Sequence, residues 1–176
     1  NFVGVGTAAP TIAAFGTLEQ QRRLLRPLFT CEEVWCQLFS EPDAGSDLAN
    51  VSTLAERDGD EWIINGHKVW TTMAHVAKWG ILVARSNPEL AKHQGLTYFL
   101  VDMTLPGIEV RPLRQISGEA EFNEVIFTNC RVPDAMRVGE PGSGWRVTIG
   151  TLMNERAHNG DSAKKPRGFG PIAHAV

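Results

Sequence analysis

Residues 53–72, TLAERDGDEWIINGHKVWTT, are the stretch that decides the fold expected for this chain. The dipeptides Asp58-Gly59 and Asn65-Gly66 are of the kind that supplies the positive φ angles of two-residue hairpin turns. The apolar residues on either side of them alternate with their neighbours, as they do in half-buried strands. The stretch therefore predicts three antiparallel strands joined by two tight turns.

Four more short strands are expected after this meander. They cover residues 79–85, 96–103, 108–112 and 124–130, and Pro106-Gly107 marks a turn between two of them. No helical pattern separates these strands. The pattern therefore favours an antiparallel sandwich or barrel over a doubly wound parallel sheet.

Helical sequence flanks the β-rich zone on both sides. In the first flank, Thr17 and Gln20 fit a capping box, and Pro27 is expected to end the stripe of leucines that follows. In the second flank, apolar residues from Trp145 onward recur at helical spacing, and this helix is expected to run to about Ala157. The expected fold class is α+β, with helices before and after an antiparallel β domain.

Composition excludes several classes of function. The chain has 176 residues, net charge −3 and pI ≈ 6.0, so there is no electrostatic reason to expect nucleic acid or an anionic membrane surface as a partner. Three cysteines are too few and too irregular for a disulfide framework, so a reducing cytosol is expected. No apolar run of about 18 or more residues is present, so no segment is expected to span a membrane, and no signal peptide is visible. Because the sequence begins without Met and stops inside an apolar stretch, we expect a fragment of a longer protein.

Common catalytic and metal-binding motifs are missing or poorly placed in the sequence. Gly4, Gly6 and Ala9 match a dinucleotide fingerprint, but that fingerprint needs a preceding strand, and we interpret the match as chance in a helical segment. The five histidines show no metal-ligand spacing with a cysteine or carboxylate. Neither a nucleophile elbow nor a P-loop occurs.

Three segments carry groups that could serve a binding site. Residues 38–47, LFSEPDAGSD, could present backbone N–H donors to an anionic or carbonyl-rich ligand, or could be a plain polar turn. Trp70 could shield one face of a planar ligand whose edge bonds Thr72, or could belong to the core or to an interface. Glu155 could act as a catalytic base if the site buries it, or could pair with Arg156 in solvent.

Five blocks, taken in order, resemble the acyl-CoA dehydrogenase family. They are CQLFSEPDAGSDLA at 36–49, DGDEWIINGHKVWTT at 58–72, ILVARS at 81–86, Val132-Pro133, and GWRVTIGTLMNER at 144–156. The resemblance covers nearly the whole chain, and the first two blocks are specific at this separation. It implies that residues 1–33 end an N-terminal helical domain, residues 34–138 form a flavin-binding middle β domain, and residues 139–176 begin a truncated C-terminal helical domain.

The resemblance also implies FAD as the cofactor. The residues that would contact it are Gln37, Leu38, Ser40, Gly45, Ser46, Trp70 and Thr72. Trp70 would cover the face of the flavin, and Thr72 would bond near its N5 edge, where hydride arrives. Gly45 and Ser46 would lie beside the pyrophosphate and the acyl-CoA, with Ser46 touching the substrate.

A catalytic base is implied in the last block. Family members carry this base either late in the C-terminal domain or on the first helix after the β domain, and Glu155 falls at the earlier position. Asn154 and Arg156 would contact the substrate, whereas Met153 stands where some members have Asp. Residues 167–170, RGFG, are one residue short of a block that contacts the FAD of a neighbouring subunit.

The activity implied is that of an FAD-dependent acyl-CoA dehydrogenase, which removes the α proton and the β hydrogen of an acyl-CoA thioester in fatty-acid β-oxidation. An electron-transfer flavoprotein would be the acceptor, and the protein would form a homo- or hetero-oligomer, a dimer or tetramer, in the cytoplasm or a mitochondrial matrix. The alternatives are a flavin oxidase or nitroalkane-oxidising relative of the same fold, and a non-catalytic partner subunit or inactive fragment. The 176 residues alone are expected to be inactive.

Overall fold

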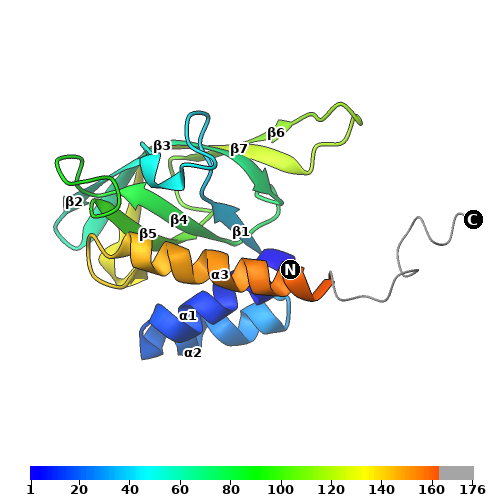
Figure 1. Cartoon of the computed structure of the whole chain (residues 1–176), viewed down its shortest axis with the longest axis horizontal. Helices are drawn as coiled ribbons and strands as arrows, with labels where there is room; N and C mark the ends of the chain where they lie inside the picture. The colour runs from blue at the N-terminus through cyan, green and yellow to red at the C-terminus, as the bar shows by residue number, and fades with distance from the viewer. Residues whose placement is uncertain (163–176) are drawn as a thin grey trace, which may run out of the picture.

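An open sheet formed by the β-rich middle of the chain is the centre of the fold (Figure 1). The computed structural model describes the backbone of residues 1–162 and the side chains of residues 1–157. Within that range the strands are β1 (Trp35–Leu38), β2 (Leu54–Asp58), β3 (Glu61–Thr72), β4 (Trp79–Arg85), β5 (Leu96–Asp102), β6 (Ile108–Leu113), β7 (Phe122–Pro133) and β8 (Arg137–Val138). Neighbouring strands follow the order β6-β7-β3-β2-β4-β5-β8, and β1 pairs in parallel with β4 outside this path.

The sheet does not close into a barrel, because β6 and β8 stand at opposite ends of the strand order. The α+β class expected from the sequence is confirmed. The sheet nevertheless bends strongly: the rings of Trp62 on β3 and Phe99 on β5 have centroids 5.4 Å apart. In a flat sheet, three strand spacings of about 4.8 Å each would separate these two strands. Its two halves therefore face each other across an apolar layer.

The turn predicted at Asp58-Gly59 is confirmed, and the one predicted at Asn65-Gly66 is wrong. Gly59 has φ +60° and joins β2 to β3 in an antiparallel pair. β3 runs without interruption through Gly66, so the predicted three-stranded meander does not exist. Gly66 lies at a register shift against β7, and a Cβ on it would collide with Thr53. This glycine therefore serves a bulge and a close approach between segments.

Helices cover one side of the sheet. They are the short π-helix η1 (Gly4–Ala8), α1 (Ala9–Phe15), α2 (Leu18–Phe29) and α3 (Gly144–Ser162), and the 3₁₀ turns η2 (Leu48–Asn50) and η3 (Asp134–Met136) lie in loops. α3 lies along the sheet, with α1 and α2 on its far side (Figure 1). The weak dinucleotide match falls in η1 and α1. Its glycines therefore lie inside helical structure and not in a turn that leads from a strand into a helix.

α2 begins as the sequence predicts and ends later. Thr17 Oγ1 accepts the N–H of Gln20, and Gln20 Oε1 accepts the N–H of Thr17, so the capping box is confirmed. The helix continues past Pro27, where the sequence predicted its end. Leu24 and Leu28 on its inner face are fully buried, and this burial outweighs the backbone hydrogen bond that the proline removes.

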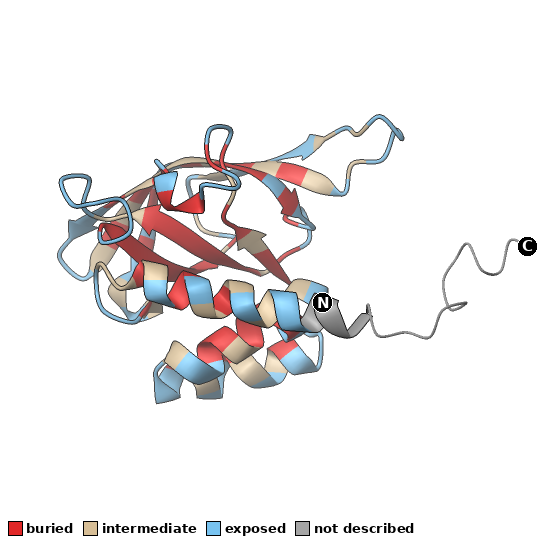
Figure 2. Cartoon of the chain, in the orientation of Figure 1, coloured by how far each residue is buried: buried red, intermediate tan, exposed pale blue. Residues whose placement is uncertain are grey.

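Two apolar clusters lie on opposite sides of β4 and β5, whose residues are nearly all buried (Figure 2). Ile81 and Val83 belong to the first cluster, which packs these strands against the helices. Leu82 and Ala84 belong to the second, which packs the same strands against β3 and β7. Successive side chains of each strand therefore enter opposite clusters. Because both faces of β4 are buried, its sequence is a near-continuous apolar run.

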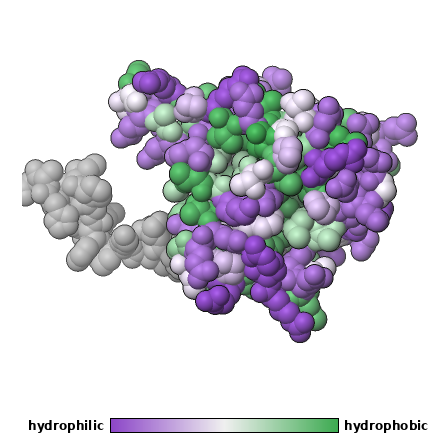
Figure 3. Space-filling view, turned by 180° about the vertical axis from the view of Figure 1, so that it is seen from behind, coloured by the Kyte–Doolittle hydropathy of each residue, from purple (hydrophilic) through white to green (hydrophobic). Residues whose placement is uncertain are grey.

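The surface is mixed in polarity. Seen from behind, hydrophilic residues dominate, and apolar residues gather toward the middle of that face (Figure 3). Large apolar side chains that stay exposed include Leu18, Phe29, Trp70, Val76 and Met153. Of the helices in the described part of the chain, none combines the length and the apolar character that crossing a membrane requires.

Candidate functional site

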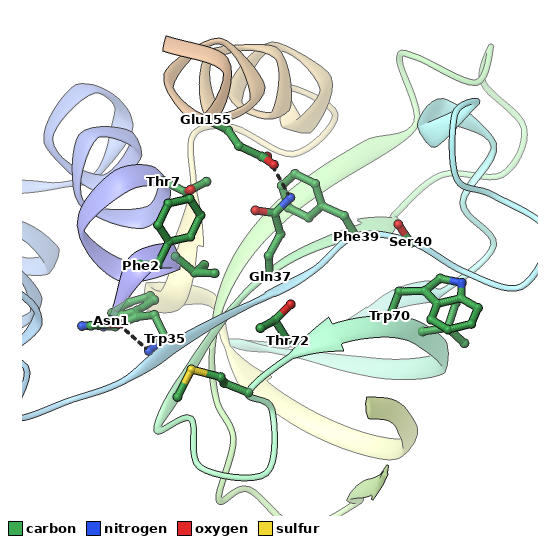
Figure 4. A pocket seen from close by; sticks show the side chains of 13 residues that line it. Asn1, Phe2, Thr7, Trp35, Gln37, Phe39, Ser40, Trp70, Thr72 and Glu155 are labelled. Carbon is green, nitrogen blue, oxygen red and sulfur yellow. Dashed lines mark hydrogen bonds between the residues drawn. The ribbon is translucent and has the colours of Figure 1, made fainter. Parts of the chain in front are cut away.

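A cavity of about 230 Å³ opens where β1 and β3 meet the helices (Figure 4). Three parts of the chain line it: the first helical flank, the ends of β1 and β3, and α3. The lining residues are Asn1, Phe2, Val3, Thr7, Trp35, Gln37, Phe39, Ser40, Val69, Trp70, Thr72, Met73 and Glu155. The fold thus brings segments that are distant in sequence around one space.

The backbone at the end of β1 is tied directly to β3. The N–H of Val69 donates to the carbonyl of Ser40 at 2.9 Å. Just after Ser40, the backbones of Glu41 and Ala44 exchange two hydrogen bonds of 2.8 and 3.1 Å and close a tight turn. This turn leads the chain away from the sheet and leaves Ser40 at the cavity edge. Residues 38–47 therefore form both a turn and part of the cavity wall.

A buried ion pair lies beneath this turn. Lys68 Nζ is 2.8 Å from Glu41 Oε1, and the side chains are 0% and 4% exposed. Glu41 also accepts hydrogen bonds from the N–H and hydroxyl of Ser52 (2.6 and 2.8 Å) and from the N–H of Thr53 (2.9 Å). Burial raises the pKa of Glu41, but the charge of Lys68 and the hydrogen bonds together outweigh it and lower the pKa to about 2. Glu41 is therefore ionised at neutral pH.

Trp70, within β3, has an unusual backbone conformation. Its φ is +58°, and the pairing of β3 with β7 shifts register between Lys68 and Thr71. Positive φ is an outlier for a bulky residue, and a bulge redirects the side chain that it contains. The indole is 63% exposed and meets Phe122 edge-on, with ring centroids 6.2 Å apart. Trp70 is therefore no core residue, and its indole is held at the edge of the cavity.

Glu155 reaches the cavity from the helical side (Figure 4). Its Oε2 accepts a hydrogen bond of 3.3 Å from Gln37 Nε2. One turn earlier on α3, the hydroxyl of Thr151 lies 2.9 Å from Thr11 Oγ1 and 3.2 Å from the hydroxyl of Tyr98. These buried hydroxyls join α3 to α1 and β5. The hydroxyl contacts thus fix α3 against α1 and β5, and the hydrogen bond from Gln37 on β1 orients the Glu155 carboxylate.

Five of the residues predicted from the sequence line the cavity together: Gln37, Ser40, Trp70, Thr72 and Glu155. Gln37 lies on β1 and Ser40 just after it, Trp70 and Thr72 lie on β3, and Glu155 lies on α3. The hydrogen bond from the N–H of Val69 to the carbonyl of Ser40 joins the first two of these segments. The RGFG segment, one residue short of a block that contacts FAD in the family, lies outside the described residues.

The other predicted residues lie away from the lining. Leu38 points to the opposite side of β1, because successive residues of a strand face opposite ways, and it is fully buried in the second cluster. The side chain of Leu38 therefore faces away from the cavity, and the flavin contact of this residue stays a prediction. Gly45 and Ser46 lie in the exposed loop, and Asn154 and Arg156 lie on α3 outside the lining.

Some lining residues were not predicted. Trp35 and Phe39 share the cavity side of β1 with Gln37, and the alternation within residues 35–39 is the signal that could have identified them. Phe2 carries no such signal, because only tertiary packing brings its segment to β1. Among the described residues, no group of three or more His, Cys, Asp or Glu side chains is placed to hold a metal ion.

Comparison with known proteins shows what the chain is similar to. A family model described as acyl-CoA dehydrogenase, middle domain, matches residues 36–130, more than half of the chain. Acyl-CoA dehydrogenase FadE34 of Mycobacterium tuberculosis is 55% identical over 149 residues, which are 85% of this chain and 21% of that protein. Acyl-CoA dehydrogenase IpdE1 of the same organism is 51% identical over 156 residues, which are 89% of this chain and 40% of that protein.

Solved structures resemble the same part of the chain. The Tcur3481-Tcur3483 steroid ACAD superimposes with a TM-score of 0.84 at 35% identity, over 88% of this chain and 40% of that chain. The chain therefore spans between 21% and 40% of the length of these three proteins.

Proposed function

Because this chain belongs to the acyl-CoA dehydrogenase family, we propose that it is the flavin-binding part of an FAD-dependent acyl-CoA dehydrogenase. The observation that carries the proposal is the cavity, which Trp70 and Thr72 from β3 and Ser40 from the end of β1 line together with Glu155 from α3. A site for a planar hydride acceptor next to a carboxylate base is what α,β-dehydrogenation of a thioester requires.

The proposed enzyme is longer than this chain. Residues 34–138 would be its middle β domain, a division that the family match at residues 36–130 supports. Residues 1–33 and 139–176 would belong to an N-terminal and a C-terminal helical domain. Because the chain spans only 40% of IpdE1, further segments would complete the substrate site. The cytoplasm is the proposed location, in line with the bacterial relatives.

The residues around the cavity fit a flavin. The exposed indole of Trp70 offers a flat apolar face, and the hydroxyl of Thr72 can bond a polar group on a ring edge. Gln37 and Ser40 add polar groups from β1, where Leu38 could contribute only its backbone. FAD bound there would accept the β hydrogen of the substrate as a hydride.

Glu155 is the proposed base. Its carboxylate lies in the cavity wall, where the hydrogen bond from Gln37 orients it, and it would take the proton from the α carbon of the thioester. Ser46, Asn154 and Arg156 are the proposed acyl-CoA contacts. Gly45 is the proposed neighbour of the cofactor pyrophosphate, and the space where its Cβ would lie is open.

Acyl-CoA is the proposed substrate and an electron-transfer flavoprotein the proposed acceptor. We propose a homo- or hetero-oligomer, and the name of the Tcur3481-Tcur3483 steroid ACAD, which joins two proteins, supports a mixed assembly. The same name makes steroid-derived acyl-CoA thioesters one substrate class to test beside straight-chain ones.

Anaerobic titration of the full-length protein with acyl-CoA thioesters tests the function. An acyl-CoA of the right class is expected to bleach the absorbance of the oxidised flavin. A flavin-containing protein that no straight-chain, branched or steroid-derived acyl-CoA bleaches would contradict the proposal. Oxygen uptake during turnover would identify a flavin oxidase of the same fold instead.

The Glu155→Gln variant tests the base. Loss of a general base is expected to slow bleaching by about 100-fold or more, with the flavin spectrum before substrate unchanged. Glu140→Gln is the matched control, because Glu140 is a highly exposed carboxylate in the loop before α3. Bleaching at the unaltered rate in Glu155→Gln would refute the assignment.

A further inference from the structure

The ammonium of Lys68 bonds three segments of the chain behind the cavity. Besides Glu41, Lys68 Nζ donates to the carbonyl of Phe39 at 3.1 Å and to the carbonyl of Val83 at 2.8 Å. An ammonium group has three N–H donors, and each one here has an acceptor. Lys68 therefore joins the end of β1, the turn at Glu41 and the middle of β4.

These contacts fix the backbone next to two of the proposed cofactor contacts. The carbonyl of Phe39 belongs to the peptide unit that leads into Ser40, and the N–H of Val69 holds the carbonyl of Ser40. Val69 and Trp70 directly follow Lys68 in β3. The ammonium and the Val69 amide thus hold the Phe39–Ser40 backbone at two successive carbonyls and set its distance from Trp70.

Burying the charges of Lys68 and Glu41 costs desolvation free energy. Burial lowers the pKa of Lys68 to about 8, and Glu41 only partly opposes this effect. Arg85 also interacts electrostatically with Glu41, but its guanidinium donates hydrogen bonds to the carbonyls of Ala49 and Val51. Since apolar residues of similar volume commonly stabilise a core as well as a buried ion pair does, packing alone does not account for it.

We propose that Lys68 and Glu41 are positioning residues, which fix the spacing between the two strand ends of the cavity and so its fit to a planar cofactor. Neither side chain belongs to the cavity lining, so neither touches the bound group. The cofactor part of this inference rests on the proposed function. The backbone part, the attachment of Ser40 to Val69, can be measured without any cofactor.

Two variants of the full-length protein test the proposal. Lys68→Met keeps most of the aliphatic stem and removes the three donors, while the double variant Glu41→Gln with Lys68→Met removes both charges and leaves no buried anion without a partner. Val132→Ala is the matched control, because Val132 is fully buried in the second cluster and is no part of the cavity lining.

Amide hydrogen exchange of flavin-free protein gives the first measurement. In both Lys68 variants the exchange of the Val69 amide is expected to accelerate by about tenfold or more, with the other β3 amides much less affected. The visible circular dichroism of the flavin, recorded at saturating FAD, is expected to change. In a separate titration, the dissociation constant for FAD is expected to rise by about tenfold. The double variant is expected to recover much of the lost thermal stability, whereas its Val69 exchange, its flavin dichroism and its dissociation constant for FAD are expected to stay altered.

The outcomes separate positioning from plain stability. Unaltered Val69 exchange and flavin dichroism in the double variant would overturn the proposal, as would the same two changes in Val132→Ala. If Lys68→Met does not fold, the double variant decides the matter. If the unaltered protein binds no flavin, the proposed function fails, and the Val69 exchange still decides the role of Lys68 and Glu41.

Discussion

Replacing Trp70 by Asn distinguishes a cofactor-facing tryptophan from a structural one. Truncating a buried Trp costs about 3–5 kcal/mol of folding free energy. At Trp70 two smaller effects oppose each other. Loss of the edge-on contact with Phe122 costs about 0.5–1.5 kcal/mol. Asn tolerates the left-handed backbone conformation at φ +58°, and relief of that strain returns about 1–2 kcal/mol. The folding free energy is therefore expected to stay within about 1 kcal/mol of the original.

The apparent Tm of flavin-free, full-length protein is the measurement, because bound flavin would add a stabilisation of its own. A change of 1 kcal/mol corresponds to about 2–4 °C for a domain of 150–250 residues. FAD affinity is expected to fall by about tenfold, since one stacking face is gone. Trp62→Ala is the buried reference and is expected to lower the folding free energy by about 3–5 kcal/mol. A loss of Tm in Trp70→Asn as large as that in Trp62→Ala, with FAD affinity unchanged, would refute the reasoning.

Three further predictions concern the packing and charges around the site. The pKa of Glu41 is lowered from 4.5 to about 2 in the folded chain, so its ionisation stabilises the fold above pH 4.5, and this stabilisation is lost as the pH falls toward 2. Glu41→Gln should therefore show a flatter dependence of apparent Tm on pH in that range, and an unaltered slope would contradict this. Thr151→Val should cost about 1–3 kcal/mol by leaving two buried hydroxyls with one partner fewer, which urea unfolding can measure, whereas Thr151→Ser should cost much less. Gly66→Ala should lose about 1–3 kcal/mol because its Cβ meets Thr53, whereas Gly45→Ala, with open space at its Cβ, should unfold at the same urea concentration as the original.

Local signals in the sequence predict the elements whose causes are local. The capping box at Thr17 and the turn at Gly59 depend on residues within a few positions of each other, and both are confirmed. The role of Gly66 was misread, because the reason for that glycine is Thr53, which approaches it from another segment. Pro27 was misread for a similar reason, since the burial of the neighbouring leucines depends on tertiary packing.

The candidate site could be predicted only in part. Trp70 and Glu155 were found as residue types suited to the chemistry, but the positive φ of Trp70 follows from a bulge against β7, which the local sequence does not reveal. A lysine in a strand is normally expected to face solvent. The burial of Lys68 is decided by Glu41, 27 residues earlier, and by a carbonyl on β4, so local patterning could not predict it.

The order of synthesis bears on when the cavity can be completed. Thr11 and Thr151 meet across 140 residues of sequence, and Glu155 lies four residues later still. The chain leaves the ribosome from its N-terminus, so β1 and β3 emerge long before α3. A contact of such long range must overcome a large loop-closure entropy, and it forms once the intervening structure has brought its ends together. The sheet therefore has to fold before Glu155 can complete the cavity, and binding of the proposed flavin there would be a late step in the maturation of the protein.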